Sequence, residues 1–149
     1  MELTQFLDAN IINTSLDAKD KNDAIRKMCK LLKEQKYVTD PDEFYEDVLE
    51  REKLGETGIG NYVAIPHGKS GCVQKTTIAI CKLQNEIEWE TLDGKGVKVI
   101  LLFAVQNDVG FEKTHLMLLA QAARKLAKSE VVESLLNAQT SEEIIQCFK

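Results

Sequence analysis

Val97-Lys98-Val99-Ile100-Leu101-Leu102-Phe103-Ala104-Val105 is the longest apolar run in this chain, and only Lys98 interrupts it. The run is far shorter than the roughly 20 apolar residues that cross a membrane, and its length suits a strand. A strand that is covered on both faces shows a nearly continuous apolar run, because neither of its faces meets water. We therefore expect 97–105 to be a central strand between two layers of helices.

The segments on either side of this strand carry helix and strand signals. A second β-rich run covers 76–81, and Asp93-Gly94 is a turn signal just before the central run. Apolar residues recur at helical spacing over about 20–36, and a largely apolar helix is expected over about 112–128. Strands are therefore concentrated in the middle of the chain.

Capping residues predict three further helices. Asp40 is typical of the N-cap of a helix that ends near Gly55, and Ser129 and Thr140 can each cap a shorter C-terminal helix. Helices at both ends with strands between them predict an α/β sandwich. Because the elements do not alternate regularly, we expect a single domain over 1–149 with a mixed β-sheet flanked by helices on both faces.

Composition narrows the classes of partner. The chain has 149 residues, which suits one domain, and its 24 Asp and Glu outnumber its 19 Lys and Arg. The formal charge of −5 without a basic stripe predicts no nucleic-acid partner, because phosphate neutralisation supplies most of that affinity. A basic protein partner fits better. The N-terminal sequence lacks the layout of a signal peptide, so we expect a cytoplasmic protein.

Metal and nucleotide cofactors are not indicated by any motif. The four cysteines are far apart with no C-x-x-C pair, and the two histidines have no partner cluster. Gly58-Ile59-Gly60 lacks the third glycine of a dinucleotide fingerprint, and Gly68-Lys69-Ser70 matches only the end of a phosphate-binding loop. We therefore expect no metal, no cofactor and no disulfide.

His67 lies in the glycine-punctuated segment 58–69, directly after the short apolar run 63–65. Pro66 limits φ and Gly68 permits unusual angles, so we expect the backbone to turn sharply on both sides of the imidazole. Such a turn would hold the ring at a strand end where a phosphoryl donor could approach. An ordinary surface-loop histidine is the alternative, although irregular loops on rigid scaffolds often carry function.

His115 and Arg51 are candidates whose residue patterns favour structural roles. His115 lies near the start of the 112–128 helix on an apolar face, which is typical of a core histidine. A histidine near a helix N-terminus could instead position a phosphate. Arg51 ends the second predicted helix, where it could complement the helix C-terminus or bind phosphate oxygens with its planar fork.

The segment 51–69, with the sequence REKLGETGIGNYVAIPHGK, resembles the signature of the fructose/mannitol-type IIA family of the phosphoenolpyruvate-dependent sugar phosphotransferase system (PTS). The similarity extends over nearly the whole chain and includes the Asp93-Gly94 turn and His115-Leu116. This resemblance implies a mixed β-sheet flanked by helices, in agreement with the expectation from the residue patterns.

The family also implies roles for individual residues. His67, which follows Ile-Pro, would be the residue that is phosphorylated, on its Nε2 atom. His115 would be the assisting active-site histidine, and Arg51 would stabilise the phosphoryl group. The implied activity is a phosphotransferase step: phospho-HPr donates to His67, and His67 donates to a cysteine of a IIB domain. The membrane IIC component would be reached only indirectly, and neither a cofactor nor a metal is implied.

Two residues depart from the family pattern, and two other functions stay open. Glu56 stands where a small polar residue is common, and Tyr62 where glycine is common. We expect both at a docking surface around His67, Glu56 in an acidic rim and Tyr62 as an apolar contact. One alternative is a regulatory nitrogen-branch IIA-like protein, and the other is a binding module with a structural His67. Neither the sugar nor the oligomeric state follows from the sequence.

Overall fold

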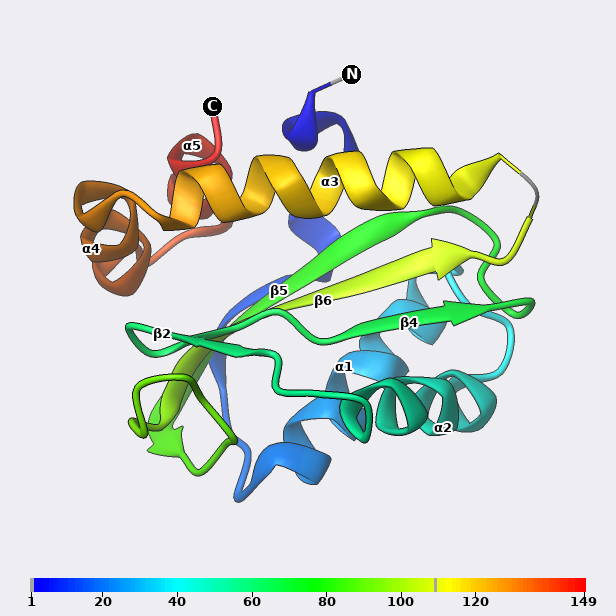
Figure 1. Cartoon of the computed structure of the whole chain (residues 1–149), viewed down its shortest axis with the longest axis horizontal. Coiled ribbons are helices and arrows are strands. Elements are labelled where there is room, and N and C mark those ends of the chain that lie inside the picture. The colour runs from blue at the N-terminus through cyan, green and yellow to red at the C-terminus, as the bar shows by residue number, and fades with distance from the viewer. Residues whose placement is uncertain (1, 109) are drawn as a thin grey trace.

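The computed structural model describes residues 2–108 and 110–149 as one mixed β-sheet with helices on both faces (Figure 1). Its elements follow one another in the order η1 (Leu3–Phe6), η2 (Ala9–Ile11), β1 (Ile12–Leu16), α1 (Lys21–Glu34), α2 (Pro41–Glu52), β2 (Gly58–Gly60), β3 (Val63–Ala64), β4 (His67–Ser70), β5 (Thr77–Ile87), β6 (Val97–Gln106), α3 (Phe111–Leu126), α4 (Ser129–Asn137) and α5 (Ser141–Cys147). The predicted α/β sandwich is confirmed.

Strand β6 is the centre of the sheet. It pairs antiparallel with β5 along one edge and parallel with β3 and β4 along the other. Strand β1 adds to β5 in parallel, and β2 adds to β3 in antiparallel fashion. The sheet is therefore mixed, as the irregular order of elements predicted.

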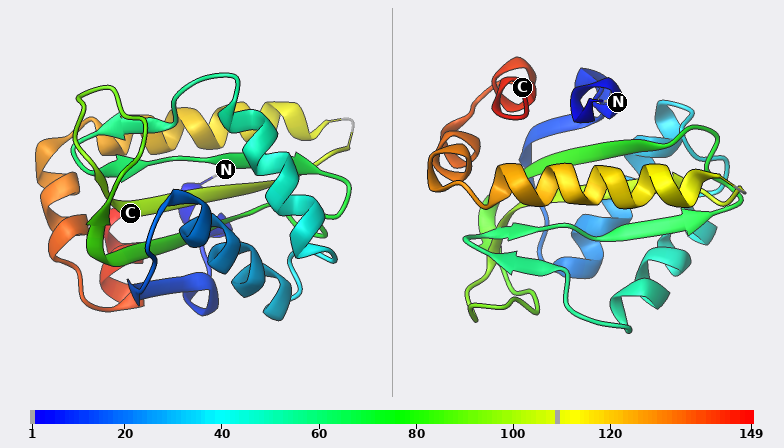
Figure 2. Two further views of the ribbon diagram at one scale, coloured as in Figure 1. Left: turned by 90° about the horizontal axis from the view of Figure 1, so that it is seen from below. Right: turned by 45° about the horizontal axis from the view of Figure 1, so that its top comes forward.

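Alternate side chains of β6 enter two separate cores, because successive residues of a strand point to opposite faces. Ile100, Leu102 and Ala104 pack in the core beneath α1 and α2. Val99, Leu101, Phe103 and Val105 pack in the core beneath α3, α4 and α5. Figure 2 shows these two helical layers from below and with the top of the molecule tilted toward the viewer. The prediction that 97–105 is buried on both faces is confirmed.

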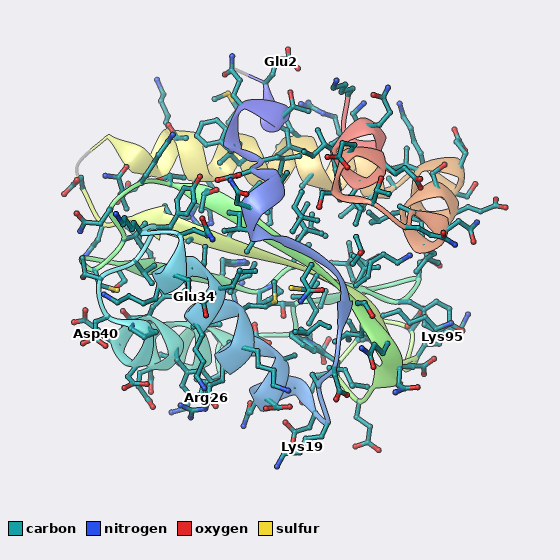
Figure 3. All side chains as sticks on the ribbon, turned by 180° about the vertical axis from the view of Figure 1, so that it is seen from behind. Glu2, Lys19, Arg26, Glu34, Asp40 and Lys95 are labelled. Carbon is teal, nitrogen blue, oxygen red and sulfur yellow. The ribbon has the colours of Figure 1, made fainter. Side chains whose placement is uncertain are left out.

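Helix starts follow the capping chemistry at two of the three predicted positions. The side chains of Asp40 and Thr140 each accept a backbone N–H from the first turn of α2 and α5, and Asp20, which was not predicted as a cap, does the same for α1. Ser129 is not a cap: α4 begins at Ser129 itself and has Lys128 at its N-cap position. The hydroxyl of Ser129 donates to the neighbouring carboxylate of Glu130. Figure 3 shows Arg26 and Glu34 at the outer surface of α1.

The predicted sharp turn around His67 is wrong, because β3 and β4 continue in one direction along β6. Val63 pairs with Val99 and His67 pairs with Phe103, so the register is unchanged across the interruption. Pro66 has no N–H to donate, but its carbonyl still accepts the N–H of Phe103 at 2.9 Å. The chain turns earlier, between β2 and β3.

Gly68 serves packing and not turning. Its backbone is extended within β4, and a Cβ there would lie 2.7 Å from Phe44 Cε1 and 2.8 Å from Val48 Cγ2. The missing side chain lets α2 lie directly against the strand. Because residues alternate along β4, His67 then faces the opposite side, toward α3. Gly68 thus places α2 and the imidazole on opposite faces of one strand.

Candidate active site

The protonation of His67 follows from the hydrogen bond of its ring to Ile65. The ring is buried, with 8% of the residue exposed, and its Nδ1 lies 2.8 Å from the carbonyl oxygen of Ile65. A carbonyl oxygen only accepts, so Nδ1 carries the proton and Nε2 keeps its lone pair. Burial lowers the pKa of His67, the Ile65 bond raises it, and the charge of Arg51 lowers it further. The net pKa is below its usual value, so at neutral pH the ring is a neutral imidazole with Nε2 as its nucleophilic atom.

Two rings lie beside His67 on the α3 face of the sheet. The ring of Phe103 stands nearly perpendicular to it, with centroids 6.2 Å apart. The ring of His115 lies edge-on, with centroids 5.4 Å apart and planes at 69°. The structure therefore brings together the two histidines that the sequence separates by 48 positions (115 − 67).

His115 lies near the N-terminus of α3 and has an unused ring nitrogen. Its Nε2 is buried and has no hydrogen-bond partner among the residues that the structure describes. Burial lowers the pKa of His115 to about 4, and the positive charges of His67, Lys69 and Arg51 add to this shift. His115 is thus neutral at physiological pH, and one ring nitrogen is left for a ligand.

Arg51 lies in the last turn of α2, and its Nη1 is also buried without a partner in the described part of the chain. Its charge lowers the pKa of both histidines, which places the guanidinium within electrostatic reach of both rings. Buried polar groups are nearly always hydrogen-bonded, so unpaired donors at one place indicate a ligand with acceptor oxygens. An anion such as a phosphoryl group has the required oxygens and charge.

Lys69 is a neighbour of the site that the sequence analysis did not identify. Its Nζ lies 3.3 Å from Glu112 Oε1, which joins β4 to the first turn of α3. Strand alternation could have indicated Lys69, because side chains two residues apart in a strand lie on the same face and Lys69 is two residues after His67. The Ile65 carbonyl was missed as well, because no residue pattern marks a backbone acceptor.

Tyr62 lies toward the start of β6, away from His67 along the strand. Its carbonyl accepts the N–H of Val99, whereas His67 is paired with Phe103, four residues further along β6. At about 3.3 Å per residue, these positions are roughly 13 Å apart. The Tyr62 ring instead lies over Lys98 Nζ, 4.2 Å from its centroid. The contact of Tyr62 with a docked partner stays a prediction.

Glu56 lies near the site because the next residue, Thr57, is hydrogen-bonded to Ile65, which contacts His67. The carbonyl of Thr57 accepts the N–H of Ile65 at 2.9 Å, and Ile65 in turn holds the His67 ring. The side chain of Glu56 is exposed. This position suits the acidic rim that the sequence analysis assigned to it.

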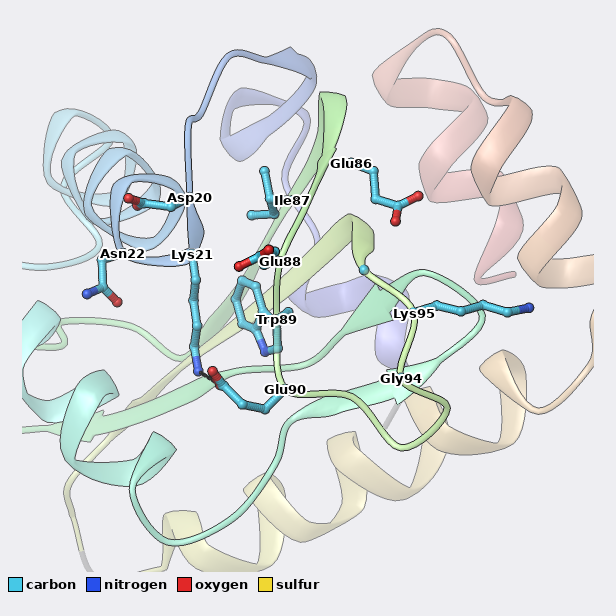
Figure 4. A pocket seen from close by; sticks show the side chains of 11 residues that line it. Asp20, Lys21, Asn22, Glu86, Ile87, Glu88, Trp89, Glu90, Gly94 and Lys95 are labelled. Atoms are coloured by element: carbon cyan, nitrogen blue, oxygen red, sulfur yellow. Dashed lines mark hydrogen bonds and ion pairs between the residues drawn. The ribbon is translucent and has the colours of Figure 1, made fainter.

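A cavity on another part of the molecule lies between the start of α1 and the loop before β6 (Figure 4). Its lining residues include Lys21, Trp89, Glu90 and Lys95 but neither of the two histidines.

Among the described residues no group of three or more His, Cys, Asp or Glu side chains is placed to hold a metal ion. In the same residues no helix has the length and apolar character needed to span a bilayer.

Comparison with known families gives one match over most of the chain. The family model described as phosphoenolpyruvate-dependent sugar phosphotransferase system, EIIA 2, matches residues 5–149. The chain is 30% identical over 145 residues to the PTS system fructose-specific EIIABC component of Bacillus subtilis (strain 168). That alignment covers 97% of this chain but only 22% of the relative.

Nitrogen regulatory proteins also match, over 88% or more of their own length. The nitrogen regulatory protein of Escherichia coli (strain K12) is 31% identical over 150 residues, covering 98% of this chain and 88% of that protein. The crystal structure of nitrogen regulatory protein IIA-Ntr from Neisseria meningitidis aligns with a TM-score of 0.90 at 26% identity, covering 99% of each chain. The matched folds thus extend across both helical layers and the sheet.

Proposed function

Because the chain belongs to the phosphoenolpyruvate-dependent sugar phosphotransferase system EIIA 2 family, we propose that His67 is its phosphoryl acceptor. In this proposal phospho-HPr donates the phosphoryl group to His67, and His67 passes it to a cysteine of a IIB domain for sugar uptake through a membrane IIC component. The observation that carries the proposal is the hydrogen bond from His67 Nδ1 to the Ile65 carbonyl, which leaves Nε2 as the nucleophile.

The first transfer is a displacement at phosphorus. The Nε2 lone pair of His67 forms the new P–N bond, while the P–N bond of the donor phosphohistidine breaks and its electron pair returns to the donor ring. The Nδ1–H of His67 keeps its hydrogen bond to the Ile65 carbonyl oxygen, and this bond stabilises the positive charge that develops on the ring. Neutral imidazole is the reactive form, and the lowered pKa of His67 keeps it populated near pH 7.

The second transfer reverses these roles. A thiolate sulfur of the acceptor attacks phosphorus, and the electron pair of the breaking P–N bond returns to His67 Nε2. Phosphoryl transfer asks a protein mainly for positioning and for stabilisation of oxygen charge. We assign that stabilisation to the unpaired Nη1 of Arg51 and to Nε2–H of His115, which is neutral and free to donate.

Exposed apolar residues next to the site support docking of protein partners. Leu116 follows His115 and is 67% exposed, and Leu54 follows the end of α2 and is 81% exposed. Large exposed apolar side chains beside a functional group are typical of interaction surfaces. We propose a weak, transient docking surface formed by these two residues with Glu56 at its rim. Exchange with HPr and a IIB domain would take place in the cytoplasm.

Phosphorylation of purified variants tests the proposal. Wild-type chain and His67→Ala are incubated with phosphoenolpyruvate, enzyme I and HPr, and the phosphoprotein is followed by mass spectrometry. We expect the wild type to accept one acid-labile phosphoryl group and His67→Ala to accept none while its circular dichroism is unchanged. Phosphorylation of the alanine variant would exclude His67 as the acceptor.

A regulatory role is the second candidate, and the full-length similarity to nitrogen regulatory proteins favours it. The same His67 would be phosphorylated, but the phosphorylation state would control other proteins and would not feed transport. A deletion strain separates the two roles. Loss of uptake of a PTS sugar, restored by wild type and not by His67→Ala, supports transport, whereas unchanged uptake with altered nitrogen-dependent growth supports regulation.

A further inference from the structure

We propose that Glu52 is a positioning residue, whose buried carboxylate links the helix end that presents Arg51 to the backbone segment that orients His67. The test by transfer rate rests on the proposed function, in which His67 accepts a phosphoryl group. Glu52 can position Arg51 and His67 without touching the phosphoryl group itself. The carboxylate lies in the last residue of α2, directly after Arg51.

The Glu52 carboxylate joins three segments of the chain. Its side chain is only 6% exposed, and its Oε1 lies 2.8 Å from Nζ of Lys21, the first residue of α1. The same oxygen accepts the hydroxyl of Thr57 at 2.9 Å. One buried charged atom therefore connects the start of α1, the end of α2 and the segment that leads into β2.

Thr57 carries this connection to the active site by consecutive hydrogen bonds. Its hydroxyl also accepts the indole N–H of Trp89 at 3.3 Å, and the residue is 2% exposed. Its backbone carbonyl accepts the N–H of Ile65, and the Ile65 carbonyl accepts Nδ1–H of His67. The position of Thr57 therefore affects the ring orientation of His67.

The same carboxylate acts on Arg51 through the helix. Adjacent residues of an α-helix are fixed about 100° apart, so holding the Glu52 side chain fixes the rotation of the last turn and the direction of Arg51. The helix ends here, and fewer backbone bonds hold this turn than hold the helix interior. A clamp at Glu52 replaces the rigidity that the helix end lacks.

A buried ion pair contributes little to the free energy of unfolding, which favours a positioning role for the Glu52–Lys21 pair. The cost of desolvating Glu52 and Lys21 offsets much of their attraction, and the best-attested role of such pairs is to select one arrangement. In addition, Glu52 Oε2 is buried without a partner among the described residues. Lys21 also pairs with Glu90 at 2.6 Å at the cavity of Figure 4, which holds its ammonium in place from the outside.

Three single variants test the proposal. Glu52→Gln removes the charge, and Thr57→Val removes the hydroxyl but keeps the Glu52–Lys21 pair. Glu50→Gln is the matched control, because Glu50 is two residues away and forms an exposed ion pair with Lys53 at 2.8 Å. For each variant we would measure the melting temperature, the transfer rate from phospho-HPr, and the His67 tautomer by ¹⁵N NMR of the ring nitrogens.

We expect Glu52→Gln and Thr57→Val to lower the transfer rate by about tenfold, the effect of losing one hydrogen bond to a charged group. The His67 ring should change from the Nδ1–H form to a mixture of tautomers, and Glu50→Gln should match wild type in both readouts. If both variants melt earlier but keep the wild-type rate and tautomer below their transitions, Glu52 is purely structural and the proposal is overturned.

Two further outcomes are separable. If Glu52→Gln does not fold, Thr57→Val alone decides, because its change is isosteric and leaves the ion pair in place. If the wild type accepts no phosphoryl group, the proposed function fails. The tautomer readout then still decides whether Glu52 orients His67, since it needs no phosphoryl transfer.

Discussion

The ring of His115 lies 5.4 Å from the ring of His67, centroid to centroid, and burial of each ring lowers the pKa of both histidines. The charge of His67 lowers the pKa of His115 further, and the charge of Arg51 lowers the pKa of both. The pair is therefore neutral near pH 7. In this neutral state His67 has a lone pair that can attack phosphorus. Neutral His115 has an N–H that can donate a hydrogen bond to an oxygen of the phosphoryl group.

The pH dependence of stability follows from the lowered pKa of His115. In the unfolded chain His115 binds a proton below its usual pKa of about 6.5, whereas in the folded chain it does so only below about 4. Between these values the unfolded state binds more protons, so stability falls as pH decreases through this window. After allowance for solvent screening, we expect a loss of roughly 1 kcal/mol at pH 5. Urea unfolding of wild type and His115→Gln at pH 7 and pH 5 should show a smaller loss in the variant; equal losses would contradict this origin.

His115→Ala should slow phosphoryl transfer without preventing it. The variant loses one hydrogen bond to the phosphoryl oxygens, which corresponds to about tenfold in rate. Quench-flow measurement of transfer from phospho-HPr and to a IIB domain checks both steps. A variant that cannot be phosphorylated at all, although folded, would give His115 an essential role that we do not assign to it.

Arg51→Lys keeps the positive charge but loses the planar fork of donors. Because one charge-assisted hydrogen bond is worth roughly 1.5–3 kcal/mol, we expect transfer to slow by about one to two orders of magnitude. Arg124→Lys, at an exposed position in the last turn of α3, is the control and should transfer at the wild-type rate. Wild-type kinetics in Arg51→Lys would reduce Arg51 to a point charge.

Gly68→Ala should destabilise the protein at the strand that carries His67. The added Cβ would lie 2.7 Å from Phe44 and 2.8 Å from Val48, and overpacking of this kind costs about 1–3 kcal/mol. Gly71→Ala is the matched control, since nothing lies within 4 Å of a Cβ there. Thermal unfolding of the two variants should differ by several degrees. Equal melting temperatures would mean that α2 can move away from β4 without cost.

Docking of the phosphoryl donor should depend on salt. With a net charge of −5 and Glu56 exposed near the site, a basic donor surface is attracted, and this attraction weakens as ions screen it. The transfer rate at subsaturating protein should fall as ionic strength rises, and less steeply for Glu56→Gln. Glu142→Gln on α5 serves as the control and should keep the wild-type slope. Equal slopes for Glu56→Gln and wild type would remove Glu56 from the rim.

Features that depend on local chemistry were predictable from the sequence. The central strand follows from an apolar run, and the starts of α2 and α5 follow from the side chains of Asp40 and Thr140, which bond backbone groups a few residues away. The family resemblance singled out Arg51 and His67 through the contiguous segment 51–69, and His115 through the separate stretch His115-Leu116. Each of these signals lies within a short stretch of chain.

Relationships between distant segments were decided by the tertiary structure. Pro66 and Gly68 resemble turn residues, but pairing with β6 keeps the backbone extended and the approach of α2 explains the glycine. The placement of Tyr62 away from His67, and of His115 beside it, depends on the parallel register of β3 and β4 on β6 and on the return of α3 across the sheet. Register and helix packing result from burying whole faces at once, so no short segment of sequence contains them.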